Sequence, residues 1–167
     1  MTQIDPIEAI RMADVLFEHT LASFPQALLH TQPRPGEWSA YEVLSHIEIV
    51  ERERYLPQLA AAVRGETLSM TPVPGVLPAS PPPFDELLAN YRATRAEEIA
   101  FLEGLPRDQW ATTIFNHWTY GEIDIHWLAR RMQQHTLDGT QQSMMALGLL
   151  TMGAYGRDAT PPASLDR

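Results

Sequence analysis

Two histidines lie on apolar faces of helix-like stretches, His46 in the first half of the chain and His135 in the second. Positions three, four and seven residues apart share one face of a helix. The apolar residues on these faces are Val43, Ile47 and Val50 around His46, and Ile125, Leu128 and Met132 before His135. Neutral imidazole is the commonest metal ligand, and burial favours the neutral form. The pattern therefore allows two interpretations: two separate hydrogen-bonded core histidines, or one shared site between facing helices that holds a metal ion.

The four other histidines give weaker signals. His126 lies nine residues before His135, about two and a half helical turns, so it faces the opposite side of the helix. His19 and His30 have no ligand-like spacing, which favours a solvated or capping role. His117 lies in a loop before the last helix, where it could approach the mouth of a site but is more readily explained as a hydrogen-bonding loop residue.

Four stretches with helical periodicity must position the two candidate ligands. We predict helices over residues 6–23, 41–63, 84–102 and 123–145. The second has the clearest start, because "SAYE" is a capping box in which Ser39 and Glu42 exchange side-chain to backbone hydrogen bonds. The stretch "RDQWATTIFNHWTYG" is predicted to be irregular or to contain a short turn, and the connection between the second and third helices contains six of the 14 prolines. The chain is therefore predicted to be all-α, a four-helix bundle with a long Pro-rich crossover between helices 2 and 3.

Residue polarity predicts which faces of these helices are buried. Charged side chains are seldom fully buried unless they are paired. The first helix is predicted to bury an apolar face made of Ile7, Ile10, Ala13, Val15, Leu16 and Leu21. On the second helix, a charged face made of Glu48, Glu51, Arg52, Glu53 and Arg54 is expected to be exposed to solvent.

Composition restricts the classes of function. Twelve Lys and Arg against 21 Asp and Glu give a net charge of −9, which argues against a nucleic-acid or anionic-membrane partner. The absence of cysteine excludes disulfides and thiolate chemistry from the protein itself. No apolar run is long enough for a membrane-spanning helix, and the N-terminal residues do not resemble a signal peptide, so a cytoplasmic location is expected.

Several motifs resemble segments of the DinB-like four-helix bundles, also called the DinB/YfiT-like metalloenzyme family. "PGEWSAYEVLSHI" at residues 35–47 is similar to that family's Trp-Ser helix start, which is followed about two turns later by a histidine. "LPRDQW", "NHWTYGEIDI" and "HTLDGTQQ" resemble family segments in the same order. The resemblance covers roughly residues 7–145 and implies a homodimer. We expect residues 1–150 to form a single domain of this type and the Gly/Pro-rich residues 151–167 to form a flexible C-terminal tail.

The resemblance also implies a set of metal ligands. Family members that bind metal use one histidine on the second helix and an H-x-x-x-H pair on the fourth, which by position correspond to His46, His135 and Gly139. Glycine has no donor atom, so either the backbone approaches closely there or the space holds water or a ligand. Asp138 would complete a two-histidine, one-carboxylate set for zinc or iron(II), unless it is solvated or paired with Arg131. An alternative register would put Arg131 and His135 on the pair, but the spacing from the preceding loop motif favours the first.

Two functions follow from these residues and the resemblance. The first is a metal-dependent enzyme of hydrolase or thiol-dependent transferase type, acting on a small molecule at a bundle-core site built on His46 and His135. Its candidate metals are Zn, Ni, Mn and Fe. The alternative is a metal-free bundle that binds a small ligand or serves a stress response and has lost the third ligand at Gly139. In the first case the Pro-rich crossover would act as a lid or pocket wall.

Overall fold

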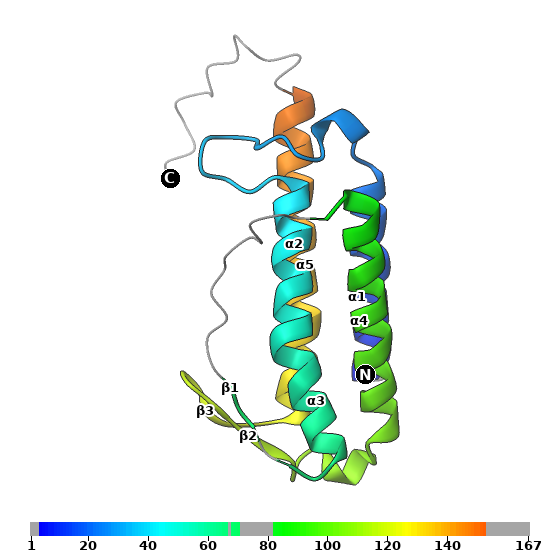
Figure 1. Ribbon diagram of the computed structural model, residues 1–167, viewed down its shortest axis with the longest axis vertical. Helices are drawn as coiled ribbons and strands as arrows, with labels where there is room; N and C mark the ends of the chain where they lie inside the picture. The colour runs from blue at the N-terminus through cyan, green and yellow to red at the C-terminus, as the bar shows by residue number, and fades with distance from the viewer. Residues whose placement is uncertain (1–3, 67, 71–81, 153–167) are drawn as a thin grey trace.

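The computed structural model describes residues 4–66, 68–70 and 82–152, whose main body is an elongated bundle of four long helices (Figure 1). α1 packs against α5, and α2 packs against both α4 and α5. The helices of the bundle are α1 (Pro6–Ala22), α2 (Ala40–Val50) continued by α3 (Leu56–Val63), α4 (Phe84–Gly104) and α5 (Ile125–Met152). The predicted four-helix bundle is confirmed, and α5 continues past its predicted end.

The second long helix contains a π-helical turn. α2 begins at the predicted capping box, where Ser39 Oγ accepts from the N–H of Glu42 at 3.2 Å and Glu42 Oε2 accepts from the N–H of Ser39 at 2.7 Å. The turn η2 (Glu51–Tyr55) then joins α2 to α3. Because a π-turn adds a residue to a helical turn, it shifts the residues that follow around the helix axis, and such turns are frequent at functional sites.

A small three-stranded sheet lies at the end of the bundle where α5 begins (Figure 1). In the sheet order β1-β2-β3, β1 (Ser69–Met70) pairs parallel to β2 (Ile114–His117), which pairs antiparallel to β3 (Gly121–Asp124). Gly121 has a φ of +71°, a conformation that glycine adopts without strain, where the chain turns into β3. The stretch over residues 107–121 contains a short turn at residues 107–109, as predicted, but its strands were not predicted, because strands of four residues are too short for an alternating pattern to be recognised.

α1 buries a partly different face from the one predicted. Ile7, Ile10, Ala13 and Leu21 are buried as expected. Val15 and Leu16 are instead 70% and 46% exposed, whereas Asp14 and Phe17 are buried. Polarity alone misassigned Asp14, which is buried because Tyr91 and Arg95 of α4 donate hydrogen bonds to its carboxylate. Two short 3-10 turns, η1 (Gln26–Leu28) and η3 (Arg107–Gln109), complete the connections.

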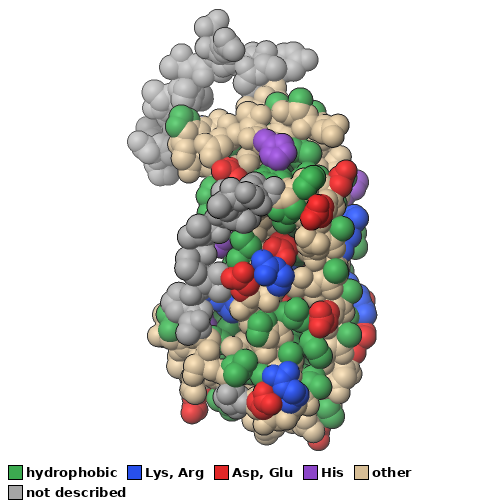
Figure 2. Space-filling view, in the orientation of Figure 1, with side chains coloured by type: hydrophobic (Ala, Val, Ile, Leu, Met, Phe, Trp, Pro, Cys, Tyr) green, Lys and Arg blue, Asp and Glu red, His purple; other side chains and the backbone are tan. Residues whose placement is uncertain are grey.

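Most of the proposed lid and tail lie outside the described residues. Residues 71–81 of the Pro-rich crossover and residues 153–167 of the tail belong to none of the three described ranges, so the lid and the tail stay predictions. Within the ranges that are described, no helix is both long and apolar enough to cross a membrane. On the face shown in Figure 2, acidic and basic side chains are interspersed rather than gathered in one patch.

Candidate functional site

The two predicted candidate ligands meet in the core of the bundle. His46 of α2 and His135 of α5 have ring centroids 5.3 Å apart, with ring planes at 77°. His135 is buried, with 7% of its surface exposed, and His46 is half-buried. Trp38, just before the capping box, also lies against His46, and their ring centroids are 4.7 Å apart. The face pattern therefore identified a pair of neighbouring imidazoles correctly.

A buried carboxylate lies behind one of these rings. Nδ1 of His135 is 3.4 Å from Oε1 of Glu51, the first residue of the π-helical turn. Burial alone would raise the pKa of Glu51, but the Arg95 guanidinium and His135 hold that pKa below its ordinary value. An ionised carboxylate only accepts hydrogen bonds, so the proton of a neutral His135 ring lies on Nδ1 and its Nε2 carries a free lone pair. This arrangement is typical of a metal-binding histidine and its supporting carboxylate.

Arg95 of α4 holds Glu51 in place. Its Nη2 lies 3.1 Å from Glu51 Oε1, its Nη1 lies 2.9 Å from Glu98 Oε2, and its Nε lies 3.1 Å from Asp14 Oδ1. Its Nη2 also donates to Thr136 Oγ1 on α5 at 3.0 Å. Burial and the neighbouring Glu51 charge raise the pKa of Glu98 well above its ordinary value.

The expectation of an exposed charged face on the second helix was wrong for two of its members. Glu48 is 5% exposed and Glu51 is 0% exposed, although Glu53 does lie at the surface. Glu51 lies four residues after Ile47, so the same face rule that selected His46 placed it on the buried side. The burial of Glu51 was not predicted because carboxylates are usually solvated unless a partner such as Arg95 is buried with them.

Asp138 does not join the histidine pair. Its carboxylate is exposed and accepts a hydrogen bond from Gln134 at 2.7 Å, and Arg131 Nη1 lies 3.4 Å away. This is the alternative pairing considered for Asp138, so the structure does not support the two-histidine, one-carboxylate set. In the described part of the chain, no group of three His, Asp or Glu side chains is arranged to hold a metal ion.

Gly139 is a point of close approach between α5 and α2. A Cβ added there would lie 2.2 Å from Cδ1 of Ile47 and 3.2 Å from Cγ1 of Val43. The space of the third family ligand is therefore filled by an α2 side chain. One turn in the other direction from His135, Arg131 lines a small cavity. Of the two positions one helical turn from His135, position 131 therefore has room for a large side chain and position 139 does not. Position 131 is the one that pairs with His135 in the alternative register.

The histidine pair fits part of a metal site. Two imidazoles that share a tetrahedral zinc ion through Zn–N bonds of about 2.0–2.1 Å would have ring centroids about 5 Å apart, and the observed separation is 5.3 Å. Burial, followed by the charges of His135, Arg54 and Arg131, lowers the pKa of His46 from 6.5 to about 4, so His46 is neutral near pH 7 as a ligand must be. The same arginines oppose binding of a cation.

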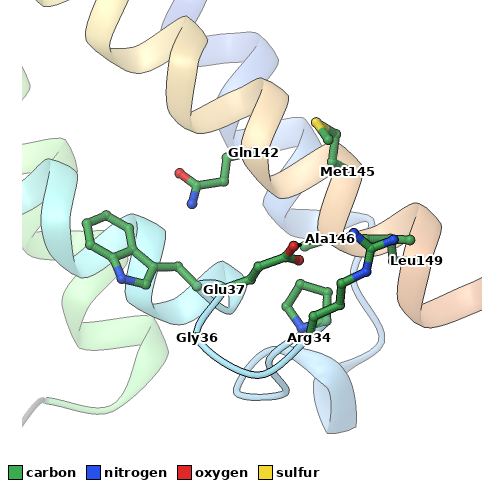
Figure 3. Close-up of a pocket in the computed structure, with 9 residues that line it drawn as sticks. Arg34, Gly36, Glu37, Gln142, Met145, Ala146 and Leu149 are labelled. Carbon is green, nitrogen blue, oxygen red and sulfur yellow. Dashed lines mark ion pairs between the residues drawn. The ribbon is translucent and has the colours of Figure 1, made fainter. Parts of the chain in front are cut away.

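A larger cavity, of about 460 Å³, lies near the other end of α5 (Figure 3). Arg34 and Glu37 of the loop before α2 face Gln142 and Met145 of α5 across it. It is lined by neither histidine, but Trp38 forms one wall and contacts His46. Trp38 therefore contacts both this cavity and the histidine pair.

These features define a class of protein: a four-helix bundle with a buried histidine pair supported by a carboxylate. The chain belongs to the DinB superfamily, whose sequence model matches residues 9–142. It is similar in structure to YfiT from Bacillus subtilis, described as a probable metal-dependent hydrolase with an unusual four-helix bundle topology. That likeness has a TM-score of 0.66 and 14% identity over 93% of this chain and 92% of YfiT.

A second solved structure supports the same fold. TT2238, described as a four-helix bundle protein, aligns with a TM-score of 0.55 and 23% identity over 81% of this chain and 95% of its own. No curated protein matches the chain in sequence. At such identities the structural likeness shows the fold, while function must be argued from the site.

Proposed function

We propose that the protein is a metal-dependent enzyme of the hydrolase or thiol-dependent transferase type, with His46 and His135 as metal ligands. The observation that carries the proposal is the buried Glu51 at Nδ1 of His135, 3.4 Å away, which leaves Nε2 for a ligand bond. A hydrogen-bonded core histidine needs no ionised carboxylate held by a buried arginine. The likeness to YfiT, itself described as a probable metal-dependent hydrolase, supports the same assignment.

Four residues of the chain would have distinct roles in such a site. His46 and His135 bind through neutral ring nitrogens, Glu51 orients His135, and Trp38 restricts water on the far side of His46. A metal ion bound there would supply Lewis-acid polarisation of an oxygen or activation of water or a thiol. Since the chain contains no cysteine, any thiol must come from a small co-substrate. Positions not filled by the two histidines would be left for water or substrate.

A second function is favoured by a specific observation, the packing of Ile47 against Gly139. Because Ile47 fills the space that a third ligand side chain at position 139 would need, the competing proposal is a metal-free bundle that binds a small ligand at the same two histidines. Homodimerisation, a cytoplasmic location and action on a small molecule stay predictions.

Elemental analysis of untagged protein separates the two proposals. After incubation with Zn, Ni, Mn or Fe(II) and removal of free metal, we expect close to one metal ion per chain in the wild type and little in His46→Ala. The matched control is His126→Ala, which removes an exposed imidazole from α5 and should keep the metal. A wild-type protein that stays metal-free, and whose thermal stability ignores both chelator and added metal, would favour the binding module instead.

A further inference from the structure

A second cavity, of about 130 Å³, adjoins the histidine pair where the β2–β3 turn meets η2 and α5. Tyr55 lines it and also lies against His135, with ring centroids 6.1 Å apart. Its other principal walls are Arg54, His117, Trp118, Trp127 and Arg131. Neither proposed function uses this cavity, although a molecule bound in it would lie next to the candidate ligands.

Arg54 contributes a guanidinium group to the wall of this cavity. Its guanidinium lies 4.4 Å from the centroid of the Trp118 ring, and its Nε is buried with no hydrogen-bond partner among the described residues. No ion pair joins it to a carboxylate within those same residues, and residues 71–81 contain no acidic side chain. A buried donor without an acceptor is unfavourable, so an anion that supplied the acceptor would be bound favourably.

Arg131 and His117 add further hydrogen-bond donors to the cavity. Arg131 has only a long contact to Asp138, 3.4 Å, and its side chain is 39% exposed. His117 Nδ1 accepts hydrogen bonds from the N–H groups of Thr119 at 3.0 Å and Tyr120 at 3.3 Å. In the neutral ring the proton must therefore lie on Nε2, which is left able to donate.

We propose that this cavity binds the carboxylate of a small aromatic acid, with Arg54 and Arg131 as its ion-pair partners. A guanidinium presents a planar pair of N–H groups that matches the two oxygens of a carboxylate. The volume suffices for a carboxylate group but leaves the rest of a larger acid outside. There the exposed Tyr120 offers a flat surface on which an aromatic ring stacks, whereas the faces of the Trp118 ring are covered by Arg54 and His117.

This inference goes beyond the proposed metal-dependent function and does not depend on it. Two guanidinium groups attract an anion whether or not a cation is bound at the histidines. If both sites exist, Tyr55 would contact both the bound carboxylate and His135. Binding must therefore be measured in the presence of a chelator, so that its failure is distinguishable from failure of the metal site.

The test is calorimetric titration of the full chain with benzoate and with benzamide, which has nearly the same shape but no charge. With EDTA present, we expect benzoate to bind at least tenfold more tightly than benzamide. Arg131→Gln and Arg54→Gln should each weaken benzoate binding at least tenfold. The matched control is Arg130→Gln, an exposed neighbour on α5 that should leave the affinity for benzoate within a factor of two.

Several outcomes would overturn the proposal. These are no binding of benzoate, equal binding of benzoate and benzamide, or wild-type affinity in the folded Arg131→Gln variant. Inorganic phosphate that binds more tightly than benzoate would also overturn the assignment to a carboxylate. Circular dichroism confirms folding of each variant, and Arg131→Gln carries the test alone if the more buried Arg54→Gln does not fold.

Discussion

Nδ1 of His135 on α5 lies 3.4 Å from the fully buried carboxylate of Glu51, the first residue of the π-helical turn that continues α2. The contact joins the two helices that carry the candidate ligands, and Arg95 on α4 fixes the carboxylate from behind. As a result, Nδ1 of His135 is engaged by Glu51, and Nε2 is the ring nitrogen available to a metal ion in the proposed site.

Replacing Glu51 by Gln should therefore weaken metal binding. A neutral amide supports the Nδ1 proton less well, and loss of such supporting carboxylates typically lowers metal affinity about 10–100-fold. Competition with a chromogenic chelator measures the change. Glu53→Gln removes a carboxylate from the exposed side of the same turn and serves as the control. Equal affinities for the two variants would show that Glu51 does not orient a metal ligand.

Much of this arrangement was readable in the sequence, and the exceptions have physical causes. The capping box at Ser39 marked the start of α2, and helical face arithmetic brought His46 and His135 together. The burial of Glu51 was not predicted, because its partner Arg95 lies 44 residues away in the sequence. The contact of Gly139 with Ile47 depends on how α5 crosses α2, which no local pattern specifies. The strands were not predicted because each has at most four residues, and β1 in addition pairs with a segment distant in the sequence.

Arg95 should be essential for stability, unlike its neighbour Arg92. Arg95→Met would leave the buried carboxylates of Asp14 and Glu51 without their cation, and breaking a buried ion pair in this way costs about 3–5 kcal/mol. Arg92 pairs with Glu18 at the surface, where such pairs are worth about 0–1 kcal/mol.

Urea denaturation of Arg95→Met and Arg92→Met, compared at equal slope, gives both free energies of unfolding. Similar losses in the two variants would mean that the buried cluster is not held together by Arg95. A preserved slope for both variants is needed for the comparison, because a changed slope would indicate an altered unfolded or folded state.

Gly139 should resist substitution, including the histidine that the family pattern suggests. Even Gly139→Ala puts a Cβ 2.2 Å from Cδ1 of the buried Ile47, and overpacking of this kind costs about 1–3 kcal/mol. Gly148 lies in the same helix with nothing within 4 Å of an added Cβ, so Gly148→Ala should stabilise the protein by up to about 1 kcal/mol.

A double variant tests whether Ile47 is the cause. Ile47→Val removes the Cδ1 atom that the new Cβ would meet, so Gly139→Ala combined with Ile47→Val should be more stable than the sum of the single changes predicts. Thermal denaturation of the four proteins measures the coupling. Strict additivity would show that the close approach at Gly139 is relieved in some other way.

His46 should make stability depend on pH in mildly acidic solution. Its pKa is 6.5 in the unfolded chain and about 4 in the folded protein, mainly because of burial and then because of His135. The unfolded state therefore binds the proton more tightly, and the free energy of unfolding falls as the pH drops from 6.5 towards 4. His46→Gln lacks this contribution. With EDTA present to keep metal from competing for the ring, the free energy of the wild type minus that of the variant should decline through this window and level off below it. Parallel curves from denaturant titrations across the window would show that His46 is not desolvated in the folded protein.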